Sequence, residues 1–148
     1  MDIIKGVPAL ADVDPVSLVG QYSRDLRTFL DPGDLVKLES PGGQGWGNHN
    51  VYLWRDGPRR TLLTFTTVGT AALGATLAQL DVDDRPPLSW YGALMLNLSG
   101  ATPAYANISA NGDVLIYWPT TVTPSTGNWL RGSVTWPSGK YVGDGSLL

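Results

Sequence analysis

The amino-acid sequence predicts an all-β protein: an antiparallel β-sandwich of the jelly-roll kind, preceded by one short helix. Residues with high strand propensity are abundant, with thirteen threonines and twelve valines against one glutamate and three lysines among 148 residues. From Asp34 onward, short runs alternate apolar and polar residues, and clusters of glycine, proline, asparagine and aspartate separate the runs. About eight short strands with such turns between them are typical of a sandwich or jelly roll.

The strands are expected along the whole of this region, with a long glycine-rich loop after the first. The expected ranges are 35–39, 51–55, 60–68, 88–98, 104–109, 113–118 and 129–136. Asn111-Gly112 lies between two of them and predicts a two-residue type I′ turn, in which both residues have a positive φ. Residues 69–80 suit either a strand or a helical turn, because alanine and leucine occur in both. Residues 81–87 are expected to form a loop, and residues 137–148 a loosely held tail.

One helix is expected ahead of the sandwich, after an irregular arm formed by residues 1–13. Asp14-Pro15 begins it with an N-cap residue and a proline at the first helical position, and Asp31-Pro32-Gly33 ends it. Apolar residues recur in it at spacings of three and four, as along one face of a coiled coil: Val19, Tyr22, Leu26 and Phe29. A helix of this length is marginally stable alone in water. Its apolar face therefore packs either on its own domain or on identical chains in a short parallel bundle.

The chain thus divides into an N-terminal arm and neck helix, residues 1–32, and a β-sandwich head, residues 33–148. The formal net charge is −3, so the chain is not expected to bind nucleic acids in general. No apolar run is long enough for a membrane span, and the first residues do not resemble a signal peptide. The absence of cysteine excludes disulfides, thiol catalysis and zinc-thiolate sites.

No catalytic set is apparent in the sequence. A serine nucleophile needs an imidazole base, and the only histidine, His49, lies in the glycine-rich loop without a Gly-x-Ser-x-Gly motif elsewhere. Asp81, Asp83 and Asp84 lack the alternate spacing and distal glutamate of a calcium loop, and are expected to form a solvated turn. The sequence therefore predicts no enzyme activity, no metal site and no cofactor.

The glycine-rich loop is the best candidate for ligand binding. It brings an aromatic ring, an imidazole and two amides close together in Trp46, Asn48, His49 and Asn50. Exposed aromatic side chains stack on sugar rings, and loops on a rigid sandwich often carry binding residues. Of the six tryptophans, those on the strands are expected to be buried, whereas Trp46 is expected to be exposed.

Two segments carry a resemblance to a known family. Residues 108–116 read Ile-x-x-Asn-Gly-x-Val-x-Ile, and residues 129–137 read Trp-x-x-Gly-Ser-x-x-Trp-Pro, with Arg85-Pro86 ahead of both. This order resembles the C-terminal head domain of bacteriophage tail-fibre and receptor-binding proteins, and residues 5–30 are similar to the N-terminal segment and neck helix of small phage minor tail proteins. The resemblance implies a homotrimer on the exterior of a virion. Its head would recognise a host surface saccharide without catalysis, and its N-terminal arm would contact other virion proteins.

Two other functions remain open. A small trimeric β-protein with an N-terminal arm could be a capsid decoration protein or head fibre with a purely structural role, and its place on the virion distinguishes this role from receptor binding. A carbohydrate-binding module of an enzyme is disfavoured, because such modules seldom begin with a neck-like helix.

Overall fold

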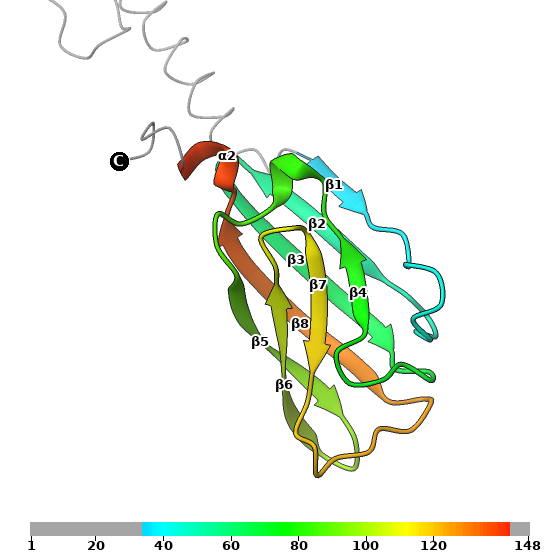
Figure 1. Cartoon of the computed structure of the whole chain (residues 1–148). Coiled ribbons are helices and arrows are strands. Elements are labelled where there is room, and N and C mark those ends of the chain that lie inside the picture. The colour runs from blue at the N-terminus through cyan, green and yellow to red at the C-terminus, as the bar shows by residue number, and fades with distance from the viewer. Residues whose placement is uncertain (1–33, 143–148) are drawn as a thin grey trace, which may run out of the picture.

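Residues 34–142 are described by a computed structural model of the chain (Figure 1). Eight strands make up most of it: β1 (Asp34–Lys37), β2 (Val51–Asp56), β3 (Arg59–Thr67), β4 (Thr76–Gln79), β5 (Trp90–Asn97), β6 (Ala101–Ile108), β7 (Asp113–Tyr117) and β8 (Trp129–Pro137). A short 3-10 helix, η1 (Val82–Asp84), follows β4, and one helical turn, α2 (Gly139–Val142), follows β8. The predicted all-β class is confirmed.

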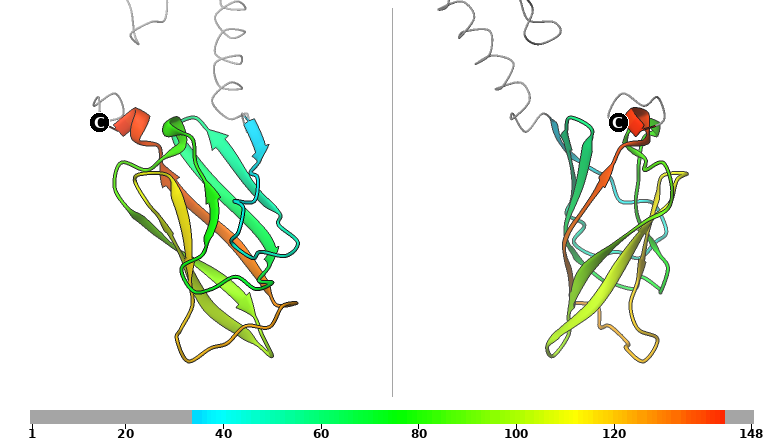
Figure 2. Two further views of the ribbon diagram at one scale, coloured as in Figure 1. Left: turned by 45° about the vertical axis from the view of Figure 1, so that its right-hand side comes forward. Right: turned by 90° about the vertical axis from the view of Figure 1, so that its left-hand side faces the viewer.

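All eight strands belong to one antiparallel sheet in the order β1-β2-β3-β8-β5-β6-β7-β4. Figure 2 shows that this sheet curls until its two halves face each other, with β1, β2, β3 and β8 in one layer and β5, β6, β7 and β4 in the other. The layers join where Met95–Asn97 of β5 pair with residues 129–131 of β8. Strands β1 and β4 are the two edges of the sheet, and the two do not pair with each other.

The core fills the space between the two layers. In β3, β6 and β7, inward residues alternate with outward ones, so these strands contribute about every second side chain to the core, whereas β1 has no buried residue. The largest fully buried side chains are Trp136, Leu53, Leu62, Leu77, Leu96, Ile108, Ile116 and Leu130. Trp118 is also buried, so the expectation of a buried tryptophan is confirmed for these two. It was wrong for Trp54 and Trp90, which are each 38% exposed, and Trp129 is partly buried.

The structure settles the segment that the sequence left ambiguous. Within residues 69–80, only Thr76–Gln79 form a strand, and this strand pairs with β7. The expected loop at 81–87 contains η1. The beginning of the expected tail is held in place, because Gly139 N–H donates to the Arg85 carbonyl at 2.8 Å.

The hairpin between β6 and β7 exists as predicted, but its turn type is different. Gly112 has a φ of 102°, and no residue other than glycine has a positive φ in the part of the chain that the structure describes. Gly112 N–H donates to the Ser109 carbonyl, and Ser109 N–H donates to the Asp113 carbonyl, so the loop has three residues and a glycine bulge. The prediction of a type I′ turn was wrong because the Asn111 side chain accepts the Asp113 N–H, a local bond that keeps Asn111 at negative φ.

The two ends of the described chain lie at the same end of the molecule. Asp34 begins β1 beside η1, and α2 lies next to them (Figure 1). The loops at 68–75, 98–100 and 119–128 lie at the opposite end, together with the loop that precedes β2 (Figure 2). The expected arm and neck helix fall outside the described residues, so the division at residues 32 and 33 stays a prediction.

Candidate functional site

The glycine-rich loop attaches to the free edge of β4. Trp46 Nε1–H donates to the Thr76 carbonyl at 2.8 Å, and His49 Nε2 lies 2.7 Å from the Leu77 carbonyl. The Gln44 side-chain oxygen accepts the Thr76 N–H at 2.8 Å. Because a carbonyl can only accept, Nε2 of His49 carries the hydrogen in this contact. Three side chains of one loop thus bind backbone groups that a neighbouring strand would otherwise bind.

The structure brings the four predicted ligand residues together but orients them differently. Trp46 is half-buried and packs against the core, whereas it was expected to be exposed. The Asn50 side chain donates to the Phe65 carbonyl at 3.1 Å, and of the four residues only Asn48 is exposed. Their ligand-binding role stays a prediction. Val19, Tyr22, Leu26 and Phe29 lie outside the described residues, and trimerisation through them stays a prediction as well.

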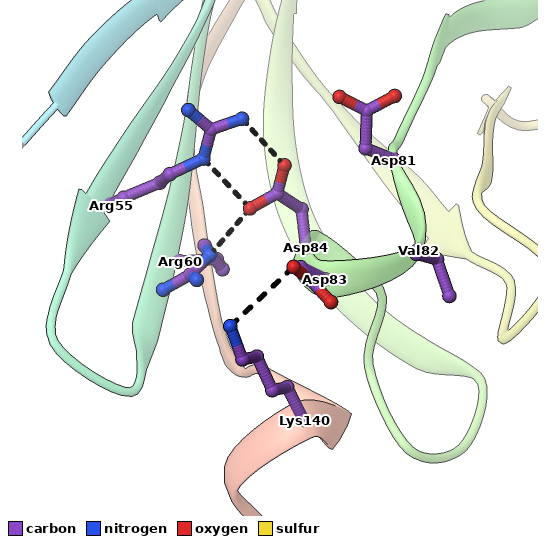
Figure 3. A pocket seen from close by; sticks show the side chains of 7 residues that line it. All are labelled: Arg55, Arg60, Asp81, Val82, Asp83, Asp84 and Lys140. Carbon is purple, nitrogen blue, oxygen red and sulfur yellow. Dashed lines mark hydrogen bonds and ion pairs between the residues drawn. The ribbon is translucent and has the colours of Figure 1, made fainter.

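A buried ion cluster lies at the other end of the sandwich, around Asp84 of η1 (Figure 3). Arg55 binds this carboxylate with two parallel bonds, Nε to Oδ1 at 2.9 Å and Nη2 to Oδ2 at 2.8 Å. Arg60 Nε donates to Oδ1 at 2.7 Å. Asp84 is 2% exposed and Arg60 is 5% exposed, so both charges have left water. The three side chains join η1 to the β2–β3 hairpin.

Two effects oppose each other on the Asp84 carboxylate. Burial alone would raise its pKa, but the hydrogen bonds from Arg55 and Arg60 outweigh burial and hold the pKa below its ordinary value. The hydrogen bond to Asp84 also raises the pKa of Arg55. The Asp84 carboxylate is therefore ionised and the Arg55 guanidinium protonated at neutral pH.

Two adjoining clefts open beside this cluster. One, of about 250 Å³, is bordered by Asp83 and Lys140, whose charged atoms are 3.5 Å apart (Figure 3). The other, of about 360 Å³, lies between residues 36–41, on the β1 side, and the end of β4 with the residues after it, Gln79 and Asp81. The second cleft thus follows the line where the two edge strands approach without pairing.

The ion cluster is the feature that sequence reasoning missed. Asp84 was expected in a solvated turn, and this expectation was wrong because the partners lie 24 and 29 residues away in sequence. The available signal was Arg85-Pro86 together with Trp136-Pro137, because the two segments around these pairs are hydrogen-bonded to each other, Gly139 N–H to the Arg85 carbonyl among them. Trp136 Nε1–H donates to the Asp84 carbonyl at 2.7 Å, so the tryptophan holds the backbone of the ion cluster.

Residues 34–142 contain no group of three or more histidine, cysteine, aspartate or glutamate side chains placed to hold a metal ion. Among the same residues, no helix has the length and apolar character needed to cross a membrane.

Comparison with known proteins gives a match at the level of fold. No protein-family model and no curated protein sequence matches the chain. Among solved structures, the chain is similar to the receptor binding protein (gp15) of Listeria phage PSA, with a TM-score of 0.57 and 16% sequence identity. The similarity covers 93% of this chain and 81% of that chain. The chain therefore has a fold that a phage receptor-binding protein also adopts, as the sequence resemblance implied.

Proposed function

We propose that the chain is a bacteriophage virion protein, a tail-fibre or receptor-binding head that attaches the particle to its host. The observation that carries this proposal is the fold similarity to a phage receptor binding protein along 93% of the chain. The arrangement of the head supports it. Both ends of the described chain lie at one end of the sandwich, so the loops at the opposite end are placed to meet another surface (Figure 1).

The proposed ligand is a saccharide of the host surface, bound by a homotrimer. The seam of Val19, Tyr22, Leu26 and Phe29 would join three neck helices, and the N-terminal arm would contact other virion proteins. Single saccharide sites of this kind are weak, and three copies raise avidity by about 10²–10⁴ when all can bind together. Attachment of this kind is passive and needs no catalytic step, metal or cofactor.

The glycine-rich loop is one proposed part of the contact surface. Asn48 projects its exposed amide from it, and amides suit the hydroxyl groups of sugars. The bonds from Trp46 and His49 to β4 fix the loop, which would reduce the entropy lost when a ligand binds.

The alternative is a capsid decoration protein or head fibre, and location on the virion decides between the two. We would label intact virions with gold-conjugated antibody raised against the purified chain and locate the label by electron microscopy. The proposal expects label at the tip of the tail. Label spread over the capsid shell would overturn it in favour of the decoration role.

A further inference from the structure

Three tyrosines form a row on the outer surface of the second layer. Tyr91 of β5, Tyr105 of β6 and Tyr117 of β7 lie side by side, and we call them the tyrosine ladder. The ring centroids of Tyr105 and Tyr117 are 5.1 Å apart with the rings nearly parallel, and those of Tyr91 and Tyr105 are 6.2 Å apart. Tyr91 is 63% exposed and Tyr105 is 44% exposed. Large aromatic rings are thus presented to solvent on rigid strands.

The surroundings of the ladder are uncharged and contain an unsatisfied polar atom. The outward neighbours on the paired strands are Ala93, Asn107 and Leu115. Asn107 lies opposite Tyr91, and its side-chain oxygen is buried without a hydrogen-bond partner among the described residues. Buried polar groups are nearly always hydrogen-bonded. A rotation of the Asn107 side chain that brings this oxygen to the surface beside the rings would let it accept a hydrogen bond from a ligand.

We propose that the tyrosine ladder is a binding platform for an uncharged saccharide. The ring faces would stack on the apolar faces of sugar units, while the phenol hydroxyls and the Asn107 amide would bind sugar hydroxyls. This inference rests on the proposed function and assigns the stacking surface within it. Trp46 is half-buried and bonded to Thr76, whereas Tyr91 is the most exposed aromatic side chain among the described residues, so the ladder is the better stacking surface.

The size, polarity and position of the ladder favour a saccharide over a second copy of the chain. Three rings on adjacent strands span about 10 Å, whereas a stable protein interface needs about 800 Å² from each partner. The polar groups of the row are neutral hydroxyls and an amide, which match an uncharged polyhydroxyl ligand. The row also ends beside Gly74, two residues before Thr76, where the glycine-rich loop is attached. A sugar chain along the ladder would reach that loop.

The test measures equilibrium binding of the full chain to purified wall polysaccharide from the bacterium that the virion infects. Tyr105→Ala should weaken binding by about tenfold, and Tyr105→Phe, which keeps the ring, should bind close to the wild type. Phe65→Ala is the matched control. Phe65 is 49% exposed and stacks on Trp129 at 4.1 Å in the other layer, so its loss should leave binding unchanged. If Tyr105→Ala does not fold, Tyr91→Ala replaces it, because Tyr91 is the most exposed ring.

Each outcome has a separate meaning. If the wild type binds the polysaccharide and the alanine variants bind equally well, the ladder is not the saccharide platform, while the proposed function stands. A wild type that does not bind the polysaccharide would overturn both. If light scattering shows that the alanine variants change the number of subunits, the ladder is an interface between copies, and the saccharide platform is wrong.

Discussion

At the scale of single residues, Asp84 connects parts of the head that are far apart in sequence. Its carboxylate accepts bonds from Arg55 and Arg60, and its backbone carbonyl accepts one from Trp136. The sequence could show that acidic and basic residues were present but not that these ones pair, because the pairing depends on how the sheet curls. Trp136 was predictable as a core residue, whereas its partner was not.

Replacing Asp84 by asparagine should destabilise the head strongly. Arg60 would be left as a buried charge with a neutral partner, and breaking a buried ion pair costs about 3–5 kcal/mol. Urea denaturation of the full chain measures this loss. Asp56→Asn is the matched control, since Asp56 pairs with the exposed Arg59 and should lose about 1 kcal/mol or less.

The ion cluster around Asp84 should also make the free energy of unfolding depend on pH. The pKa of Asp84 is lowered in the folded state, so the unfolded state takes up the proton first as the pH falls. The contribution is therefore fully present above about pH 5 and is lost as the pH falls through the folded pKa. The stability difference between wild type and Asp84→Asn should be constant above about pH 5 and should shrink as the pH falls below that value. A difference that does not shrink there would contradict this account.

Gly112 tests the corrected turn. Alanine there would meet a positive φ and would place its Cβ 2.6 Å from the Leu80 carbonyl oxygen. We expect Gly112→Ala to lower the free energy of unfolding by about 1–3 kcal/mol. Gly57→Ala separates the two causes, because Gly57 also has a positive φ but nothing lies within 4 Å of the added Cβ. Equal losses in the two variants would remove the steric part of the explanation.

At the scale of elements, the glycine-rich loop closes an edge of the sheet. Sequence composition predicted the loop and its position between strands, but not that its side chains would bind β4. Glycines let it pack on the loop at 68–75: a Cβ at Gly45 would lie 2.6 Å from Thr70 Oγ1, and a Cβ at Gly69 would clash with the Gly45 carbonyl. The strand β4 was ambiguous in sequence because alanine and leucine occur in strands and helices alike, and its pairing with β7 decides its conformation.

Trp46 should therefore contribute to stability. Trp46→Ala removes core packing and the donor to the Thr76 carbonyl, and we expect a loss of about 2–4 kcal/mol. Trp46→Phe keeps most of the packing and should lose less. Thermal melting followed by circular dichroism measures both. An unchanged melting temperature in Trp46→Ala would mean that the loop does not depend on this contact.

At the scale of the whole molecule, the sandwich has one end where the chain enters and leaves and another end made of loops. The sequence predicted the fold class, most strand positions and the resemblance to phage receptor-binding heads. It could not predict the curl of the sheet or the tyrosine ladder, because both depend on strand order, which local patterns do not encode.

The proposed trimer belongs to this scale. Replacing both Leu26 and Phe29 by aspartate would place charges in the seam of the neck helix. The molar mass measured by light scattering at micromolar concentration should then shift from that of three chains toward that of one. A wild-type chain that is monomeric under these conditions would refute the neck-helix trimer.

The central claim, attachment to a host surface saccharide, is tested most directly by competition on living cells. Host bacteria are incubated with excess purified chain before the virus is added, and the fraction of virus adsorbed is counted. We expect the chain to bind the cells and block adsorption, and periodate oxidation of surface sugars to abolish its binding. A folded chain that does not bind the cells, or that binds equally well after periodate treatment, would contradict the claim.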